Sequence, residues 1–487
     1  MTDIYTVITD FNLVPLIPEI FMALFAMGLL IVGVSQGNRS TSVICWASVA
    51  GLAITALLIM GLDWQHKIIL NGMFVFDEFA GFMKLLVLLG LMASLALSVR
   101  YLAQEGIERF EYPVLVVMSG VGMMMMLSAN NMLTLYVGLE LQSLALYVLA
   151  AFHRNAVRSA EAGLKYFVLG ALSSGMLLFG ISLLYGFTGS IDFGAIGASL
   201  LAADSISFGP IFALVFIVAG LAFKISAVPF HMWTPDVYQG APESVTALFA
   251  IVPKVAAMGL LMRLLFEPFA AMADQWGQII YFLSLASMLV GAFGGIAQLS
   301  IKRLIAYSSI GNMGYALIGI VAGTPQGAGA VIVYLLIYMI MTAGVFAVIL
   351  SMRRNGAAVE WIGDLAGLSK SNPVMAYAMA ILLFSMAGIP PMAGFFGKIL
   401  VFQAAVAEGY YVLSVLGVVS SVVAAYYYLR VIKVMFFDEA ADPFDGRTPF
   451  ARRAVLLIST AFVLAFILKP SLIVESAQSA ALSLFFG

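Results

Sequence analysis

The sequence predicts an all-α polytopic membrane protein with about 14 transmembrane helices. Composition indicates the class, because 63% of the 487 residues are hydrophobic and only 10% are charged, a balance that soluble globular domains do not have. The apolar residues form continuous runs near the ~20 residues that a helix needs to cross a bilayer, without the period-two alternation of a membrane barrel. The predicted segments lie at 13–34, 43–62, 79–98, 112–128, 131–151, 161–187, 209–230, 242–265, 276–298, 302–322, 327–350, 374–405, 410–436 and 453–474.

Basic residues in the connections predict how these helices are oriented. When alternate connections are assigned to the two sides, one side receives only Lys67, with Arg263 and Lys469 at helix ends. Lysine and arginine accumulate in cytoplasmic loops, so we expect the other, basic-rich end to face the cytoplasm. Both termini would then face the periplasm of a bacterial inner membrane. The N-terminus has no basic region and is not expected to be a cleaved signal peptide. The basic-rich end carries Arg39, Arg100, Arg109, Arg154, Arg158, Lys302, Arg303, Arg353, Arg354, Lys370, Arg430, Lys433, Arg447, Arg452 and Arg453.

The sequence offers little for cofactor chemistry. Cys45 is the single cysteine, which excludes a disulfide within the chain and a cysteine metal site. There is no GxxxxGK[ST] nucleotide loop and no GxGxxG in a strand–turn–helix setting. Of the histidines His66, His153 and His231, two lie in loops, which argues against a bis-histidine haem inside the bilayer. We therefore expect no cofactor and no metal in this chain, and energy for transport must come from an ion gradient or a partner.

Five lysines lie inside the predicted membrane segments: Lys84, Lys165, Lys224, Lys254 and Lys398. Glu140 is the one acid deep in a segment, since Glu19 lies near the start of the first segment, where water is close. A charged residue at this depth costs roughly 2.5–3.5 kcal/mol and usually marks function. A mainly cationic set with one carboxylate suits groups that pass protons better than groups that bind a metal cation.

Several of these residues also have structural interpretations. Lys84, near one end of its segment, is expected to extend its ammonium to the membrane interface. Glu140 is either a protonated carboxyl bonded to a neighbouring helix or, as we favour, the partner of a buried lysine. Lys165 follows Glu161 by one helical turn, so a local ion pair and a place in a proton path are equally open.

The stretch from Gly220 to Lys254 organises the chain. Pro229 lacks an N–H group and predicts a break in segment 209–230 near residues 225–229, directly after Lys224. Such breaks inside a membrane occur beside polar cavities or buried protein. His231 is expected at the cytoplasmic edge, followed by a tight return to segment 242–265, where Lys254 lies about 18 Å in, near mid-depth.

Segment 374–405 repeats this arrangement. It is interrupted by Gly388, Pro390 and Pro391, and Lys398 follows the interruption. Two proline-broken segments, each with a lysine beside the break, indicate inverted repeats. They are the fourth members of two five-helix blocks, the fourth to eighth and the ninth to thirteenth segments, and a block of five places its second copy in the opposite orientation. We expect domains at 1–110 (three N-terminal helices), 111–268 (first repeat), 269–437 (second repeat) and 438–487 (last helix).

Three stretches carry a resemblance to a known family: GLAFKISAVPFHMWTPDVYQGAP, QLSIKRLIAYSSIGNMGY and SMAGIPPMAGFFGK. They resemble the antiporter-like membrane subunits of respiratory complex I and of multisubunit cation/proton antiporters, over essentially the whole chain. Three features favour one complex I branch: Glu140 in LELQSLALYVLAAFHR, Lys398 where a sister branch has glutamate, and the short chain after the last segment.

The resemblance implies roles for matched residues. Glu140 and Lys224 are similar to the acid–lysine pair that tunes proton uptake, Lys254 to the central lysine, and Lys398 to the lysine on the exit side. Lys165 and His231 match intermediate members of the same polar axis. It also implies neighbouring antiporter-like and other membrane subunits as partners, with FMN, iron–sulfur clusters and quinone held in or near other subunits.

These observations predict a proton-translocating subunit of NADH–quinone oxidoreductase, driven by redox chemistry elsewhere in the complex. Two alternatives stay open. A subunit of a multisubunit Na⁺/H⁺ antiporter would show sodium-dependent transport. A structural scaffold would lose assembly, not turnover, when its lysines are replaced; we rank it lower because buried charges cost free energy that a scaffold does not need.

Overall fold

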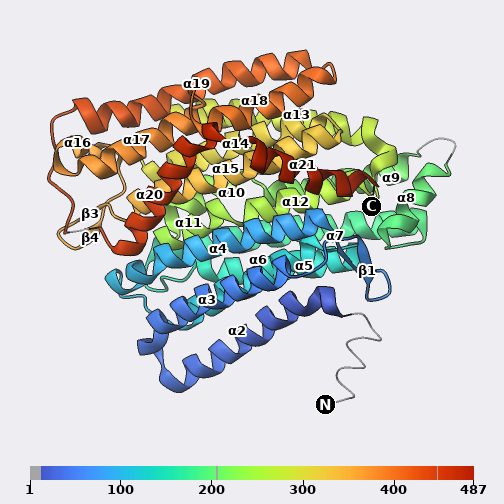
Figure 1. Ribbon diagram of the computed structural model, residues 1–487, viewed down its shortest axis with the longest axis horizontal. Helices are drawn as coiled ribbons and strands as arrows, with labels where there is room; N and C mark the ends of the chain where they lie inside the picture. The colour runs from blue at the N-terminus through green and yellow to red at the C-terminus, as the bar shows by residue number, and fades with distance from the viewer. Residues whose placement is uncertain (1–12, 204–206, 447, 487) are drawn as a thin grey trace.

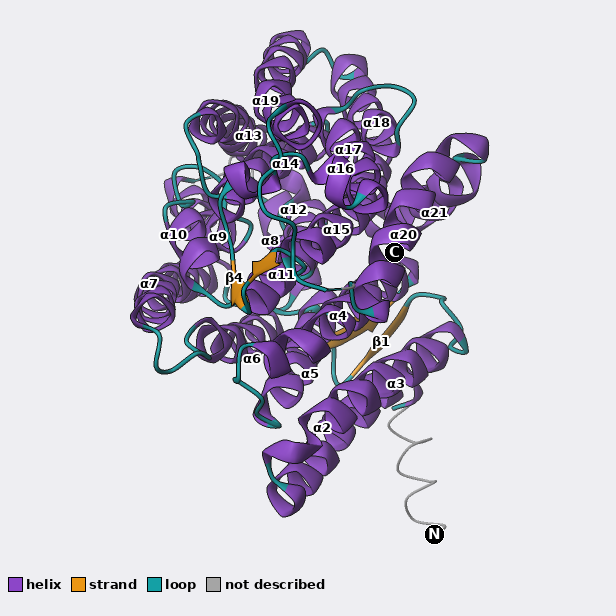
Figure 2. Cartoon of the chain, turned by 90° about the vertical axis from the view of Figure 1, so that its left-hand side faces the viewer, coloured by secondary structure: helices purple, strands orange, loops and turns teal. Residues whose placement is uncertain are grey.

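The computed structural model describes residues 13–203, 207–446 and 448–486. Most helices run roughly along the longest axis of the molecule, as a bundle (Figure 1). Viewed nearly along the helices, α2 and α3 lie at one edge, and α18 and α19 lie at the opposite edge (Figure 2). The start of α2 and the end of α21 lie at the same end of the bundle, so the chain crosses the bundle an even number of times between them.

The helices of the bundle are α2 (Ile17–Gln36), α3 (Thr41–Met60), α4 (Glu78–Gln104), α5 (Glu111–Leu127), α6 (Met132–Ala150), α7 (Val157–Thr188), α9 (Phe208–Lys224), α11 (Glu243–Ile251), α12 (Pro253–Phe266), α13 (Ala273–Ile296), α14 (Ile301–Val321), α15 (Pro325–Ile349), α17 (Pro373–Ala387), α18 (Ala393–Ala407), α19 (Tyr411–Phe437), α20 (Phe450–Ala465) and α21 (Ser471–Phe486). Short helices connect them: α8 (Phe193–Leu201), α10 (Trp233–Gly240), α16 (Leu368–Ser371), and the 3₁₀ turns Val14–Leu16, Asn38–Ser40, Ala270–Met272, Ile362–Leu365 and Phe466–Leu468.

Each predicted membrane segment coincides with one helix or with a consecutive pair. Within the described residues, 11 helices are long and apolar enough to cross a membrane, and α5, α9, α17, α18 and α21 are shorter apolar helices. The all-α membrane fold is therefore confirmed. The last segment was predicted too short, at 453–474: helix α20 ends at Ala465, and after Pro470 a further helix, α21, continues to Phe486.

The two predicted repeats pack alike. In each block the first helix lies against the second, as α5 on α6 and α13 on α14, and the third lies against the fourth, as α7 on α9 and α15 on α18. Both first pairs meet at glycines: a Cβ added to Gly122 would lie 2.6 Å from the carbonyl oxygen of Gly138, and one on Gly291 would lie 2.4 Å from the amide nitrogen of Gly311. Small residues permit this backbone contact, which replaces hydrophobic driving force inside a bilayer.

Both predicted helix breaks are present. Helix α9 ends at Lys224, and residues 225–232 are not helical before α10 begins at Trp233. Helix α17 ends at Ala387, and α18 begins at Ala393 with Lys398 in its second turn. The expected tight return after His231 is wrong in detail, because residues 233–240 form α10; Pro235 fits its first turn, where no intrahelical N–H is required.

Two short antiparallel hairpins mark opposite ends of the bundle (Figure 1). Strands β1 (Lys67–Ile69) and β2 (Phe74–Phe76) pair at one end. Strands β3 (Arg353–Arg354) and β4 (Ala357–Ala358) pair at the basic-rich end. Neither hairpin is among the elements predicted from the sequence.

Candidate functional site

Lys398 lies in the break of its own membrane segment. Its ammonium donates hydrogen bonds to the carbonyl oxygens of Met386 and Ala387, both at 3.1 Å, and to the Ser421 hydroxyl at 2.7 Å. Those carbonyls are at the C-terminal end of α17, where helical carbonyls lack intrahelical partners and carry partial negative charge. A Cβ on Gly388, whose φ is +85°, would lie 3.2 Å from this nitrogen, so glycine leaves room for it.

Lys254 lies on α12, where the eighth segment is also interrupted, between Ile251 and Pro253. Its ammonium donates to the Ser309 hydroxyl at 2.6 Å, and that hydroxyl lies 2.6 Å from the hydroxyl of Tyr338. The same ammonium lies 5.3 Å from the centre of the Tyr238 ring. Lys254 is 1% exposed and Lys398 is 6% exposed, and no carboxylate of the described residues lies within 4 Å of either nitrogen.

Neutral polar side chains occupy the region between these two lysines. They come from α14, α15 and α19 and form short hydrogen-bonded groups: Tyr334 to Asn312 at 2.7 Å, Asn312 to the Ser308 carbonyl at 2.8 Å, Ser308 to Tyr428 at 2.5 Å, and Tyr315 to Ser420 at 2.9 Å. The ring of Tyr315 lies 4.7 Å from the Lys398 nitrogen. These residues are not among the predicted site residues, although SSIGN in segment 302–322 is an unusual polar run inside apolar sequence.

Lys224, at the last position of α9, is held by α6. Its ammonium donates to Ser143 at 2.9 Å and to Tyr147 at 3.1 Å. Glu140, one turn earlier on α6, is half-buried and accepts a hydrogen bond from Ser174 of α7. The structure brings the predicted acid–lysine pair into one neighbourhood, but among the described residues the two charges are not within 4 Å of each other.

Lys165 and His231 lie apart from these contacts. Lys165 is 42% exposed and pairs with Glu161 at 2.8 Å and with Asp236 at 2.9 Å, so its geometry favours the local ion pair. Asp236 also pairs with Arg303 at 2.9 Å. His231 is half-buried in the break after α9, and its Nδ1 has no hydrogen-bond partner among the described residues.

The expectation that Lys84 reaches the membrane interface is wrong. Lys84 is fully buried, and its ammonium lies 2.6 Å from a carboxylate oxygen of Glu19, which is 4% exposed. The rings of Phe74 and Phe76 lie 4.7 and 5.1 Å from the same nitrogen. The strand β2 that carries these rings closes over the end of α4 and removes Lys84 from water.

A second buried ion pair lies near the same hairpin. Arg263 lies in the last turn of α12, as predicted for a helix end, and its guanidinium is fully buried and binds both carboxylate oxygens of Asp77, at 2.8 and 3.0 Å. It also donates to Glu267 at 2.6 Å. Burial raises the pKa of Glu267 to about 7, although Arg263 beside it favours the carboxylate. The bidentate contact of Arg263 with Asp77 is the arrangement in which arginine binds a carboxylate most strongly.

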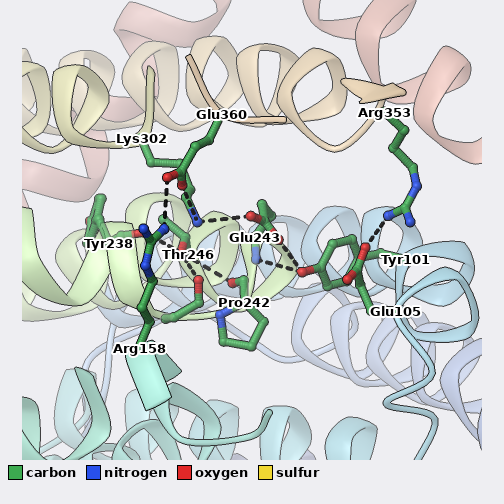
Figure 3. Close-up of polar contacts among 11 residues, drawn as sticks. Tyr101, Glu105, Arg158, Tyr238, Pro242, Glu243, Thr246, Lys302, Arg353 and Glu360 are labelled. Atoms are coloured by element: carbon green, nitrogen blue, oxygen red, sulfur yellow. Dashed lines mark hydrogen bonds and ion pairs between the residues drawn. The ribbon is translucent and has the colours of Figure 1, made fainter. Parts of the chain in front are cut away.

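A charged cluster lies at the basic-rich end (Figure 3). Lys302, which is 4% exposed, lies between Glu243 at 2.9 Å and Glu360 at 3.5 Å. Glu360 also accepts from Arg158 at 3.1 Å, and Glu243 accepts from the Tyr101 hydroxyl. Lys302 is predicted from the sequence to be a loop residue, because nothing in the neighbouring sequence shows that residues 358–364 cover it.

The chain is similar to known proteins over most of its length. The family described as "NADH:quinone oxidoreductase/Mrp antiporter, TM" matches residues 129–424. A NADH-quinone oxidoreductase subunit N of Parvibaculum lavamentivorans is 54% identical over 466 residues, which are 96% of each chain. The chain belongs to the NADH-quinone oxidoreductase subunit N family. A subunit N of Rhodospirillum rubrum is also 54% identical, over 97% of this chain and 98% of the relative.

Solved structures support the same assignment. A chain of respiratory complex I from Thermus thermophilus with bound aureothin matches with a TM-score of 0.80 and 32% identity, over 95% of this chain and 99% of that chain. A chain of the Mrp complex from Dietzia matches with a TM-score of 0.82 at 23% identity, which shows the shared fold. This subunit N family member is thus a multi-pass membrane subunit of complex I, as the resemblance implied, and its partners are other membrane subunits of that complex.

Proposed function

We propose that this subunit carries protons across the membrane through Lys224, Lys254 and Lys398, with Glu140 beside the first of them. The redox chemistry that drives the transfer takes place in other subunits, and this chain contributes translocation without a redox centre of its own. Its basic-rich end faces the cytoplasm and its termini face the periplasm.

One observation carries the proposal: Lys254 and Lys398 are buried, yet within the described part of the chain their hydrogen bonds go only to neutral oxygens. A relay group must be tolerated with and without its proton. A carboxylate partner favours the charged form of a lysine, and Lys84 has such a partner in Glu19, whereas hydroxyl and carbonyl oxygens accept hydrogen bonds from either an ammonium or a neutral amine.

The neutral groups between Lys254 and Lys398 support transfer between them. Hydroxyl groups can donate and accept in turn, and ordered waters bridge polar groups at little free-energy cost. Tyr315, Tyr334 and Tyr338 are all buried, so this region lies inside the protein and away from lipid. The roles of Lys165 and His231 remain predictions.

The test compares two lysines of the assembled complex. Lys254→Met removes a buried amine with neutral partners, and Lys433→Met removes a 64% exposed amine paired with Asp438 at 2.7 Å. Proton pumping and quinone-linked NADH oxidation are measured in membranes, with assembly checked on a native gel. We expect Lys254→Met to assemble and lose pumping, and Lys433→Met to keep it. Wild-type pumping by assembled Lys254→Met would refute the proposed path.

A further inference from the structure

A cavity of about 430 Å³ opens at the basic-rich end, beside the charged cluster. Residues of α4, α7, α10, α11 and α14 line it, together with the connection 358–364. Its volume and polar walls suit a group of waters. We call it the end cavity. Its lining includes Glu243 and Lys302.

The pair formed by Glu243 and Lys302 has an unusual setting for an ion pair. Both side chains are largely buried, at 16% and 4% exposed, yet both line a cavity. Lys302 has a second carboxylate, Glu360, at 3.5 Å, so it keeps a partner if Glu243 becomes neutral. Glu243 keeps hydrogen bonds to Tyr101, since its backbone N–H also lies 3.2 Å from that hydroxyl (Figure 3).

Two helices lead from this pair to Lys254. Glu243 begins α11, and Lys254 follows 11 positions later, about 16 Å along a helix at 1.5 Å per residue. Lys302 lies in the first turn of α14, and Ser309, which accepts the hydrogen bond of Lys254, lies seven positions later. Seven residues are nearly two turns, so Lys302 and Ser309 share one face of α14, about 10 Å apart.

A buried hydroxyl lies within this gap. Tyr238 of α10 is fully buried, its hydroxyl has no hydrogen-bond partner among the described residues, and its ring lies against the Lys254 ammonium. The next two residues, Gln239 and Gly240, line the end cavity. A buried hydroxyl without a partner is costly, and a water between the cavity and Lys254 would satisfy it.

We propose that Glu243 and Lys302 form the proton-uptake site that loads Lys254 from the basic-rich end, with Tyr238 marking the route between them. A hydronium in the end cavity transfers a proton to the Glu243 carboxylate and becomes water, and Lys302 shifts its contact to Glu360. The carboxyl then passes the proton through water to the neutral amine of Lys254, which becomes an ammonium, and Glu243 returns to its ion pair. This inference rests on the proposed role of Lys254.

Apolar residues lie between the Glu243–Lys302 pair and Lys254, and they explain why protons do not leak along this route. On the shared face of α14, Ile305 and Ala306 lie between Lys302 and Ser309 and are buried. Water must enter this gap for transfer to occur. The ion pair opposes that entry while Glu243 is charged, because its carboxylate is held by Lys302 and Tyr101.

The experiment uses the assembled complex in membranes and three variants. Glu243→Gln cannot carry a proton, and Glu243→Asp can. Asp438→Asn serves as a control, because it alters a half-buried carboxylate that pairs with an exposed lysine, Lys433, at the same end. We expect Glu243→Gln to lower proton pumping and quinone-linked NADH oxidation by roughly tenfold or more, and Glu243→Asp to restore most of both. The residual rate of Glu243→Gln should fall further in D₂O than the wild-type rate, because proton uptake has become limiting.

A purely structural role gives a different result. Should Glu243→Gln fail to assemble, the double variant Glu243→Gln with Lys302→Gln removes both charges and leaves none unpaired; the inference requires that this assembled form also pumps poorly. Wild-type pumping by either assembled variant would overturn the uptake site. If Lys254→Met is inactive while Glu243→Gln pumps normally, the proposed path stands and only its uptake site is wrong; if both pump normally, the path itself is wrong.

Discussion

Replacing Lys224 by arginine separates a proton relay from a structural charge. Lys224 is 5% exposed and donates to Ser143 and Tyr147 at 2.9 and 3.1 Å. A guanidinium keeps the positive charge and can donate to the same two oxygens, but it keeps its proton at every accessible pH. A structural charge therefore survives Lys224→Arg, and a relay does not.

The magnitudes follow from these contacts. Alanine removes two charge-assisted hydrogen bonds, each worth about 1.5–3 kcal/mol, so Lys224→Ala should destabilise this part of the fold by roughly 3–6 kcal/mol. Arginine retains them. With a pKa above about 12, less than about one arginine in 10⁵ is neutral at pH 7. If each cycle needs the neutral form, the barrier rises by about 7 kcal/mol, which abolishes turnover.

The assay is proton pumping and quinone-linked NADH oxidation in membranes, with the amount of complex taken from a native gel. We expect Lys224→Arg to assemble as the wild type does and to pump no better than Lys224→Ala. Full pumping by assembled Lys224→Arg would mean that Lys224 supplies only charge, and the relay assignment would fall.

Three further predictions follow from single contacts. Lys84→Met should lower the free energy of unfolding by about 3–5 kcal/mol, because it leaves the buried Glu19 carboxylate unpaired. Adding Glu19→Gln should restore most of this loss; if the losses of the two single variants simply add in the double variant, the pairing is contradicted. Gly388→Ala should displace the Lys398 ammonium, whose nitrogen would lie 3.2 Å from the new Cβ, and slow pumping with normal assembly; unchanged pumping would show that this position of the ammonium is not needed. Lys165→Gln should change pumping less than about fivefold, because exposed ion pairs contribute at most about 1 kcal/mol; a larger loss would return Lys165 to the path.

The breaks and the lysines beside them could be predicted because their causes are local. Pro229 excludes a helical hydrogen bond wherever it lies, and a lysine inside 20 apolar residues is conspicuous without any partner. The ion-pair partners of these lysines could not be predicted from local sequence. Glu19 and Lys84 lie on separate helices, and only the packing of β2 over α4 shows that no water reaches them.

Neutral groups were harder still to recognise. Ser309, Asn312 and Tyr338 are as common at helix contacts as in polar paths, so their sequence positions carry little information. The hydrogen bonds of Ser309 with Lys254 and Tyr338, and of Asn312 with Tyr334, depend on how α14 lies relative to α12 and α15. Lys302 was assigned to a loop for the same reason, since the residues that bury it are some 60 positions away in the chain.

The contact between Lys398 and the end of α17 has an evolutionary consequence. Two of the three hydrogen-bond partners of this ammonium are main-chain oxygens, which are present whatever side chain is encoded; the third is the Ser421 hydroxyl. No single codon change can remove the two main-chain oxygens, in contrast to the Glu19 carboxylate beside Lys84. A substitution that makes the helix continuous between α17 and α18 would remove these main-chain hydrogen bonds. Selection to keep the Lys398 contact therefore acts on Gly388, Pro390 and Pro391, and a search for covarying acid–base pairs would not detect the contact.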